Sequence, residues 1–295
     1  MSDNPLVALS DHAAALVERV AGATVAVRAG RAWSSGIHWR SGVIVTAEEV
    51  LERDDDITIV LPGGREVAAT LAGRDPTTDV AVLRVQPDGL AVAEIAESGS
   101  LRPGHIVLAV GNHRGAPVAN LGSVAFVGGA WMSQRGGAID TLLRLDLTLS
   151  PAAEGGALAD AHGRVLGMVV AGPRGRVLAI PRATIDRAVD ALLAKGYVGR
   201  GYLGAGLQPI RSRERAGVLV ASIDPDGPAA QAGLLPGDVV IRLDDVAING
   251  VDDLIRTLDR DRIDRELKMD VLRMGRLREV DIHPIERRPV VARPR

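Results

Sequence analysis

Short runs of β-branched and aliphatic residues, bounded by glycine, proline or charged residues, dominate the chain between residues 23 and 181. Such runs predict β-strands. Because almost no helical spacing separates them, they favour closed barrels or a sandwich over alternating strand–helix units. The predicted strands are Ala23–Arg28, Gly42–Thr46, Ile57–Leu61, Glu66–Leu71, Val80–Val85, Ile106–Val110, Gly122–Val127, Leu142–Leu147, Val165–Val170 and Val177–Ile180.

Helical spacing occurs on both sides of this strand-rich block. Apolar residues between Leu9 and Val20 recur about one helical turn apart, which predicts an amphipathic helix. A second helix is predicted after Pro181, with an apolar face that includes Ile185 and Leu192. Gly196 is its expected C-cap, because glycine readily adopts the left-handed conformation that ends many helices.

The segment Gly199-Arg200-Gly201 predicts a hinge, and the pattern changes after it. Strands are expected at Gly217–Ile223 and Gly237–Leu243, a short helix over Pro228–Ala232, a longer helix over Val251–Leu258, and a final hairpin across Gly275. We therefore divide the chain into an N-terminal helical segment (1–22), a mainly β domain (23–198), a small α+β domain (199–289) and a tail (290–295).

Composition narrows the class of function. The 295 residues carry 35 Lys+Arg against 37 Asp+Glu, and a formal net charge of −2 argues against a nucleic-acid binder that relies on a basic surface. There is no cysteine, which excludes disulfides and thiolate catalysis. No stretch is long and apolar enough to predict a membrane span. The six histidines show no metal-ligand spacing, and we expect neither a metal nor a cofactor.

The first residues, Met1 to Pro5, lack the basic and apolar segments of a secretory signal. The sequence as written therefore predicts a cytoplasmic location. A periplasmic or other extracytoplasmic location is the alternative if the start is mis-annotated.

Several stretches, taken in order, resemble the HtrA/DegP-type serine proteases with a C-terminal PDZ domain. They are the hairpin from Ser35 to Thr46, the segment Asp75–Leu83, the pair Gly111-Asn112, the loop Ser150–Leu158, the segment Leu178–Pro181, and the PDZ-like segments 201–204 and 227–238. The resemblance implies a trypsin-like double β-barrel over residues 23–198 and a PDZ domain over residues 199–289. It also implies serine peptidase chemistry, which needs a Ser hydroxyl, a His base and an Asp.

The residues at the catalytic positions of the family disagree with that chemistry. Asp79 matches the catalytic Asp, but the His position holds Glu49 and the Ser position holds Glu154. The oxyanion-hole glycine is replaced by Ala152, whose Cβ restricts the backbone freedom that glycine has there. A carboxylate cannot act as the hydroxyl nucleophile, so we predict a pseudoprotease without an intact triad.

The three carboxylates are expected to meet in one cleft, which leaves an alternative open. Like charges that close raise at least one pKa, and a carboxyl pair that shares a proton can activate water. Oxygen ligands of this kind can also hold Ca²⁺ or Mg²⁺. The alternative function is therefore a hydrolase or a cation-binding protein that uses Glu49, Asp79 and Glu154.

The PDZ-like domain provides the main expected function. PDZ domains add an extended peptide to a sheet edge and bind its terminal carboxylate with backbone N–H groups. The segment Tyr202-Leu203-Gly204-Ala205 is similar to that loop, and the helix Val251–Leu258 would form the other wall. We expect binding of protein C-termini or unfolded polypeptides, in the role of adaptor, holdase or regulator in protein quality control. Active HtrA-type relatives and a homo-oligomer remain open as partners.

Overall fold

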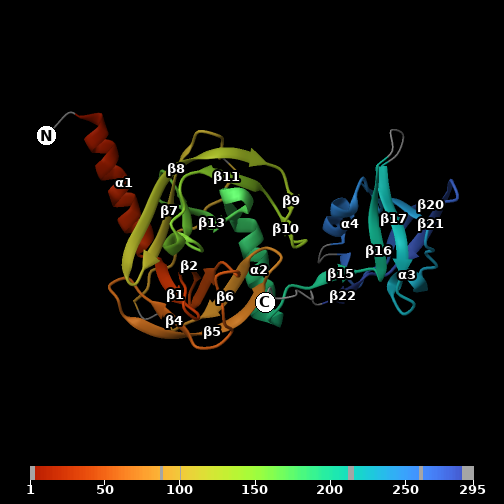
Figure 1. The fold of residues 1–295 in the computed structure, drawn as a ribbon, viewed down its shortest axis with the longest axis horizontal. Helices are drawn as coiled ribbons and strands as arrows, with labels where there is room; N and C mark the ends of the chain where they lie inside the picture. The colour runs from red at the N-terminus through yellow and green to blue at the C-terminus, as the bar shows by residue number, and fades with distance from the viewer. Residues whose placement is uncertain (1–3, 87–88, 100, 212–215, 259–261, 288–295) are drawn as a thin grey trace. The chain divides into compact units, whose positions relative to one another are not determined.

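The computed structural model describes residues 4–86, 89–99, 101–211, 216–258 and 262–287. It divides into two compact units, Met1–Tyr197 and Val198–Arg295, shown as ribbons in Figure 1. The fold is mainly β, as the strand-rich pattern predicts. Within the described residues, no helix is long and apolar enough to cross a membrane.

The first of two barrels in the first unit is closed and antiparallel, with the strand order β1-β2-β3-β6-β5-β4. Aliphatic side chains such as Val25, Ile44, Ile59 and Leu83 fill its interior, in keeping with the low aromatic content of the chain. The strands are β1 (Thr24–Arg28), β2 (Trp33–Arg40), β3 (Val43–Thr46), β4 (Ile57–Val60), β5 (Glu66–Asp75) and β6 (Val80–Arg84).

A second closed barrel follows in the order β11-β14-β13-β12-β7-β8, and it packs Leu143, Leu158 and Val169 inside. Strand β12 was not predicted, because it is short and includes two alanines directly after a glycine pair. A small hairpin of β9 (Trp131–Met132) and β10 (Ala138–Ile139) accompanies this barrel. The barrel strands are β7 (Ile106–His113), β8 (Ala116–Gly128), β11 (Leu142–Asp146), β12 (Ala157–Asp160), β13 (Val165–Ala171) and β14 (Val177–Pro181).

Two helices flank the barrels (Figure 1). Helix α1 (Pro5–Ala21) starts before the predicted Leu9, because the Asn4 side chain accepts the Leu6 N–H and proline is favoured in the first helical turn. Helix α2 (Arg182–Lys195) ends as predicted at Gly196, whose φ of 76° is left-handed. Asp186 of α2 accepts a hydrogen bond from the Trp39 indole at 2.8 Å, which ties this helix to the first barrel.

The second unit is an antiparallel sheet in the order β16-β17-β18-β20-β21, with β19 pairing β18 and a separate pair of β15 and β22. Its helices are α3 (Pro228–Gln231) and α4 (Val251–Thr257). The strands are β15 (Arg200–Tyr202), β16 (Ala205–Arg211), β17 (Ala216–Ile223), β18 (Val239–Leu243), β19 (Val246–Ala247), β20 (Leu267–Arg273), β21 (Arg276–Ile282) and β22 (Ile285–Arg287).

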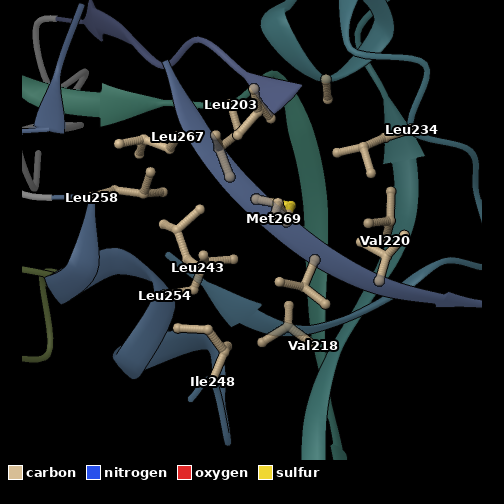
Figure 2. Packing of buried hydrophobic residues seen from close by; sticks show 14 residues of the cluster. Leu203, Val218, Val220, Leu234, Leu243, Ile248, Leu254, Leu258, Leu267 and Met269 are labelled. Carbon is tan, nitrogen blue, oxygen red and sulfur yellow. The ribbon is translucent and has the colours of Figure 1, made fainter. Parts of the chain in front are cut away.

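Figure 2 shows the core of this unit, in which Leu254 of α4 and Met269 of β20 lie among the labelled side chains. Both are fully buried. The buried face of α4 therefore fixes that helix against the sheet. The expected tail, residues 290–295, lies outside the described residues.

Candidate functional site

The turn between β5 and β6 positions Asp79. The buried Asp75 carboxylate accepts hydrogen bonds from the Thr77 N–H at 3.1 Å, the Thr77 hydroxyl at 2.6 Å and the Thr78 hydroxyl at 2.7 Å. These bonds hold a tight turn, and Asp79 leaves it with a left-handed φ of 58°. Its Oδ1 then accepts the Glu49 N–H at 2.9 Å. The carboxylate of Asp79 therefore lies beside the position that holds histidine in the resembled family.

The residue before Glu49 fixes that loop. Glu48 is buried, and its two oxygens lie 3.0 Å from Arg74 Nη1 and 3.2 Å from Arg135 Nη1. Arg135 comes from the segment between β9 and β10, so the ion pairs connect that segment to the loop after β3. This role was not predicted from the sequence. The sequence shows two adjacent glutamates, Glu48 and Glu49, but does not show which of them is buried.

The loop at the nucleophile position forms a single turn of 3₁₀ helix, Pro151–Ala153. The Ser35 hydroxyl of β2 donates to the Ala152 carbonyl at 2.6 Å, and the Ser35 N–H donates to the Glu154 carbonyl at 2.8 Å. Glu154 directs its own N–H to the Pro151 carbonyl at 3.3 Å. In the family this N–H would help to bind an oxyanion, and here it is already used inside the loop.

The Glu154 side chain reaches across the site. Its Oε1 accepts the Ala171 N–H at 3.0 Å, and its carboxyl lies within hydrogen-bonding reach of the Glu49 carboxyl. Partial burial of the Glu49 carboxyl and, next in size, the negative charge of Glu154 raise the pKa of Glu49. The structure thus brings Glu49 and Glu154 together, with Asp79 hydrogen-bonded to the same loop.

Asp79 is the most strongly perturbed acid of this group. Burial raises the pKa of Asp79 to about 8, and the negative charges of Glu49, Glu48 and Glu154 act in the same direction. The hydrogen bond from the Glu49 N–H opposes them. In the conventional triad a histidine would stabilise the ionised Asp, whereas here Asp79 is largely protonated at neutral pH.

A cleft of about 670 Å³ lies beside these acids, and both Glu49 and Asp79 line it. Ala171, which donates to Glu154, lines it as well. Arg144, another lining residue, stacks over the Phe126 ring at 5.5 Å. The cleft is large enough to hold an apolar side chain. No histidine is among the described residues that line it. The remaining walls combine apolar side chains with arginines, among them Phe126, Trp131, Ile139, Leu142, Arg144, Arg176 and Leu178.

No histidine takes the role of the missing base within the described part of this site. His38, the nearest histidine in sequence, is buried in β2; its Nδ1 lies 2.8 Å from the Ala91 carbonyl and its Nε2 accepts the Gly42 N–H at 3.1 Å. Both ring nitrogens are therefore hydrogen-bonded to the main chain of this unit. Among the described residues, no group of three or more acidic, histidine or cysteine residues is arranged to hold a metal ion.

The second candidate site is the loop from Tyr202 to Ala205 in the second unit. The Leu203 carbonyl accepts the Ala229 N–H at 2.7 Å and the Gly204 carbonyl accepts the Asp224 N–H at 2.8 Å. Within the described residues, the N–H groups of Leu203 and Gly204 have no hydrogen-bond acceptor. Gly204 has a φ of 71°, and a Cβ there would lie 2.8 Å from the Cα of Gly227. The close approach requires glycine.

Two elements flank this loop. Strand β16 starts at Ala205 and is the edge of its sheet, and helix α4 packs against β16 and β17. Ala205 and Leu207 are partly buried against the core that contains Leu254. Strand β16 was not predicted from the sequence, because Gly206, Gln208 and Pro209 interrupt its apolar pattern. We call the loop Tyr202–Ala205, strand β16 and helix α4 together the groove.

Two further residues support the loop and were not identified from the sequence. Asp224 accepts the Tyr202 hydroxyl at 2.8 Å, and the Arg287 guanidinium lies 4.5 Å from the centre of the Tyr202 ring. The Tyr202 hydrogen bond lowers the pKa of Asp224. Both residues are distant from Tyr202 in the sequence, so only the fold brings them to the loop.

These two units define a class of protein: a trypsin-like peptidase fold joined to a PDZ domain. The family model for a trypsin-like peptidase domain matches residues 34–168, and the model for a PDZ domain matches residues 201–283. A structure of the HtrA-type protease AlgW with a decapeptide is 26% identical, with a TM-score of 0.83, over 94% of this chain and 99% of that chain. A serine endoprotease from Yersinia pestis is 28% identical, with a TM-score of 0.78, over 92% and 96% of the two chains.

Curated relatives agree with the structural neighbours. A probable periplasmic serine endoprotease of the DegP-like type from Halomonas elongata is 33% identical over 82% of this chain and 53% of its own. A relative of the same description from Brucella suis is 32% identical over 82% and 50%. The chain belongs to the HtrA/DegP family of trypsin-like proteases with a PDZ domain. It spans about half the length of these curated relatives.

The same relatives correct the expected location. They are named periplasmic, and the names point to the periplasm rather than to the cytoplasm. The cytoplasmic prediction was wrong because it depended only on the residues at the start of the sequence, which do not determine the compartment of a chain that spans part of its relatives.

Proposed function

We propose that this chain is a pseudoprotease of the HtrA family that binds peptides through its PDZ domain and acts as an adaptor, holdase or regulator. The observation that carries the proposal is Glu154, a carboxylate at the nucleophile position that is hydrogen-bonded to the Ala171 N–H. Covalent catalysis by a serine protease needs a hydroxyl at that position and an imidazole beside it. This site offers two glutamates.

The local backbone adds a second reason. Removal of triad members leaves a residual acceleration of about 10³–10⁴-fold that depends on binding and the oxyanion hole. Here the Glu154 N–H is bonded to the Pro151 carbonyl, and the adjacent carboxylate would repel a developing oxyanion. The remaining source of acceleration is therefore weakened as well.

The groove of the second unit supports peptide binding. The N–H groups of Leu203 and Gly204 suit a terminal carboxylate, the open edge of β16 suits a strand, and the half-buried Ala205 and Leu207 suit an apolar side chain. Related structures of AlgW contain a decapeptide and a tripeptide. We propose protein C-termini, including those of unfolded polypeptides, as the ligands.

The raised pKa of Glu49 favours one alternative function, which is hydrolysis by the pair Glu49 and Glu154. Burial and, next in size, the negative charge of Glu154 raise the pKa of Glu49, and a raised pKa is also expected of a carboxyl pair that shares a proton. Such a pair activates water in aspartic proteases. Hydrolysis by this acid pair would be confined to acid pH and would need both carboxyls.

Peptide binding is tested with a library of peptides that have random sequences and free C-termini, by measuring Kd for the best binder. The same sequence with a C-terminal amide is the control. We expect the amide to bind at least about tenfold more weakly, because it loses the charge-assisted hydrogen bonds of the carboxylate. Equal affinity of the acid and the amide would contradict recognition of C-termini.

A further inference from the structure

A proline lies in the edge strand that would receive the peptide. Strand β16 reads Ala205-Gly206-Leu207-Gln208-Pro209-Ile210-Arg211, and it pairs with β17 on one side only among the described residues. Proline has no N–H and is found in sheets mainly at edges, with its nitrogen directed away from the neighbouring strand. The position of Pro209 therefore affects the open side of β16.

The register shows which main-chain groups face the open side. Gly206 pairs with Ser222 and Leu207 pairs with Val220, so the extra residue of the bulge is Ala221 of β17 and β16 alternates without interruption. The Gly204 carbonyl, at an even position, is bonded to the Asp224 N–H on the β17 side.

Two observations on the odd positions agree with this alternation. The Val220 N–H, opposite Leu207, is directed to the Asp238 carbonyl and away from β16. Pro209, opposite Val218, has no N–H to donate. Ala205, Leu207 and Pro209 thus direct their main-chain groups to the open edge.

The loop sets the direction and register of an added peptide. The N–H groups of Leu203 and Gly204 precede β16, so a carboxylate bound there places the peptide C-terminus at the start of the strand, and the peptide runs antiparallel to β16. Antiparallel bonding repeats every second residue. The last peptide residue then meets Ala205, the third from the end meets Leu207, and the fifth from the end meets Pro209.

We infer that Pro209 limits recognition to the last four residues of the ligand. At the fifth residue from the end, the peptide carbonyl finds no N–H to accept, and the proline ring occupies the space where that N–H would point. The rest of the ligand leaves the sheet edge at this point. The inference depends on the proposed function, because it specifies how many residues of a bound C-terminus the groove recognises.

Recognition of only the last four residues has a functional consequence. A C-terminus that protrudes from a folded protein by only a few residues is a sufficient ligand, and residues further upstream do not contribute to selectivity through the strand. A competing explanation is that Pro209 only protects the sheet edge from pairing with other chains, which is a common use of proline at edges. The two explanations differ in how affinity depends on peptide length.

The experiment uses the best binder from the free-carboxylate library, shortened from its N-terminus to eight and to four residues. Wild-type protein is expected to bind both lengths with Kd values within about twofold. Pro209→Ala restores one N–H, so it is expected to bind the octapeptide about three- to tenfold more tightly and the tetrapeptide unchanged. Pro236→Ala is the matched control, because it removes an exposed proline that lies outside the groove, and it should behave as wild type at both peptide lengths.

Each outcome separates the explanations. A gain of about tenfold or more from four to eight residues in the wild type would overturn the inference, as would a Pro209→Ala variant with wild-type length dependence. In the latter case, increased self-association would support edge protection alone. Failure of every peptide to bind would instead refute the proposed function. Circular dichroism confirms that the Pro209→Ala variant folds. The amide introduced at position 209 is expected to be protected from hydrogen exchange by the octapeptide but not by the tetrapeptide.

Discussion

The cleft of the first unit and the groove of the second differ in how their polar groups are used. Beside the cleft, the Glu154 N–H and a carboxylate oxygen of Glu154 are bonded within the protein, and burial and the negative charge of Glu154 raise the pKa of Glu49. In the groove, the carbonyls of Leu203 and Gly204 are bonded, while their N–H groups have no acceptor among the described residues. A site whose N–H donors are bonded within the protein has few donors left for a substrate. A site whose N–H donors have no acceptor can donate them to a ligand.

Glu48 gives the largest expected effect within the cleft unit. Glu48→Ala removes a buried carboxylate and leaves Arg74 and Arg135 without it, so we expect the free energy of unfolding to fall by about 3 kcal/mol. Glu97→Ala is the control, since its ion pair with Arg182 is exposed and is worth about 0.5 kcal/mol. Denaturant unfolding measures both. Equal losses in the two variants would show that Glu48 does not anchor the loop.

A substitution in the loop of the groove should abolish peptide binding without any change in the cleft of the first unit. Gly204→Val places a branched side chain at a positive φ and against Gly227, so we expect peptide affinity to fall by about a hundredfold or more. Gly129→Val is the matched control, because it lies outside the groove and a Cβ there meets open space without a left-handed φ. Titration calorimetry with the library-derived peptide gives the affinities. Wild-type affinity of the Gly204 variant would remove the loop from the binding site.

The pH dependence of stability tests the electrostatics of the cleft. Because the pKa of Asp79 is raised to about 8, the folded protein keeps a proton that the unfolded chain releases near pH 4. The free energy of unfolding should therefore fall as pH rises between these values, by at most about 1.4 kcal/mol per pH unit from this group. Above pH 8 its contribution is constant.

Asp79→Asn removes that titration and keeps an oxygen for the Glu49 N–H, so the slope of stability against pH should become shallower between the unfolded and folded pKa values. Asp55→Asn, at an exposed position, should retain the wild-type slope. Unfolding at a series of pH values gives the comparison. Identical slopes in all three proteins would show that Asp79 is not perturbed.

The smallest effect is expected from Glu154→Gln. The amide oxygen still accepts the Ala171 N–H, but the negative charge beside Glu49 is gone. We expect the pKa of Glu49 to move down toward its ordinary range and the stability at neutral pH to rise by about 0.5 kcal/mol. Carbon-detected NMR titration of Glu49 measures the shift. An unchanged titration would mean that the two carboxyls do not interact.

Much of the fold was predictable because strands in barrels have a strong local signature. The runs around Ile44, Val82 and Val169 are aliphatic on both sides of the strand, and all are found in barrels. The helix at Arg182–Lys195 was predicted with its cap at Gly196. Strand β16 was missed, since Gly206 and Pro209 weaken its local pattern and its place is set by pairing with β17.

The candidate sites were predictable only as positions, not as interactions. The family resemblance identified Glu49, Asp79 and Glu154. In the structure Glu49 and Asp79 line the cleft, and burial and, next in size, the charge of Glu154 raise the pKa of Glu49. Nothing local in the sequence indicates that Glu48 is buried between two arginines, or that Arg287 stacks on Tyr202. Those interactions depend on segments that are distant in the chain.

The most direct test of the account is cleavage of a labelled unfolded protein from acid to alkaline pH, with Glu154→Ala measured beside the wild type. We predict no turnover by the wild type above that of the variant at any pH, since neither protein has a hydroxyl nucleophile and a histidine base at this site. Turnover that is confined to acid pH and lost in Glu154→Ala would contradict the account and would show that the carboxyl pair hydrolyses peptides.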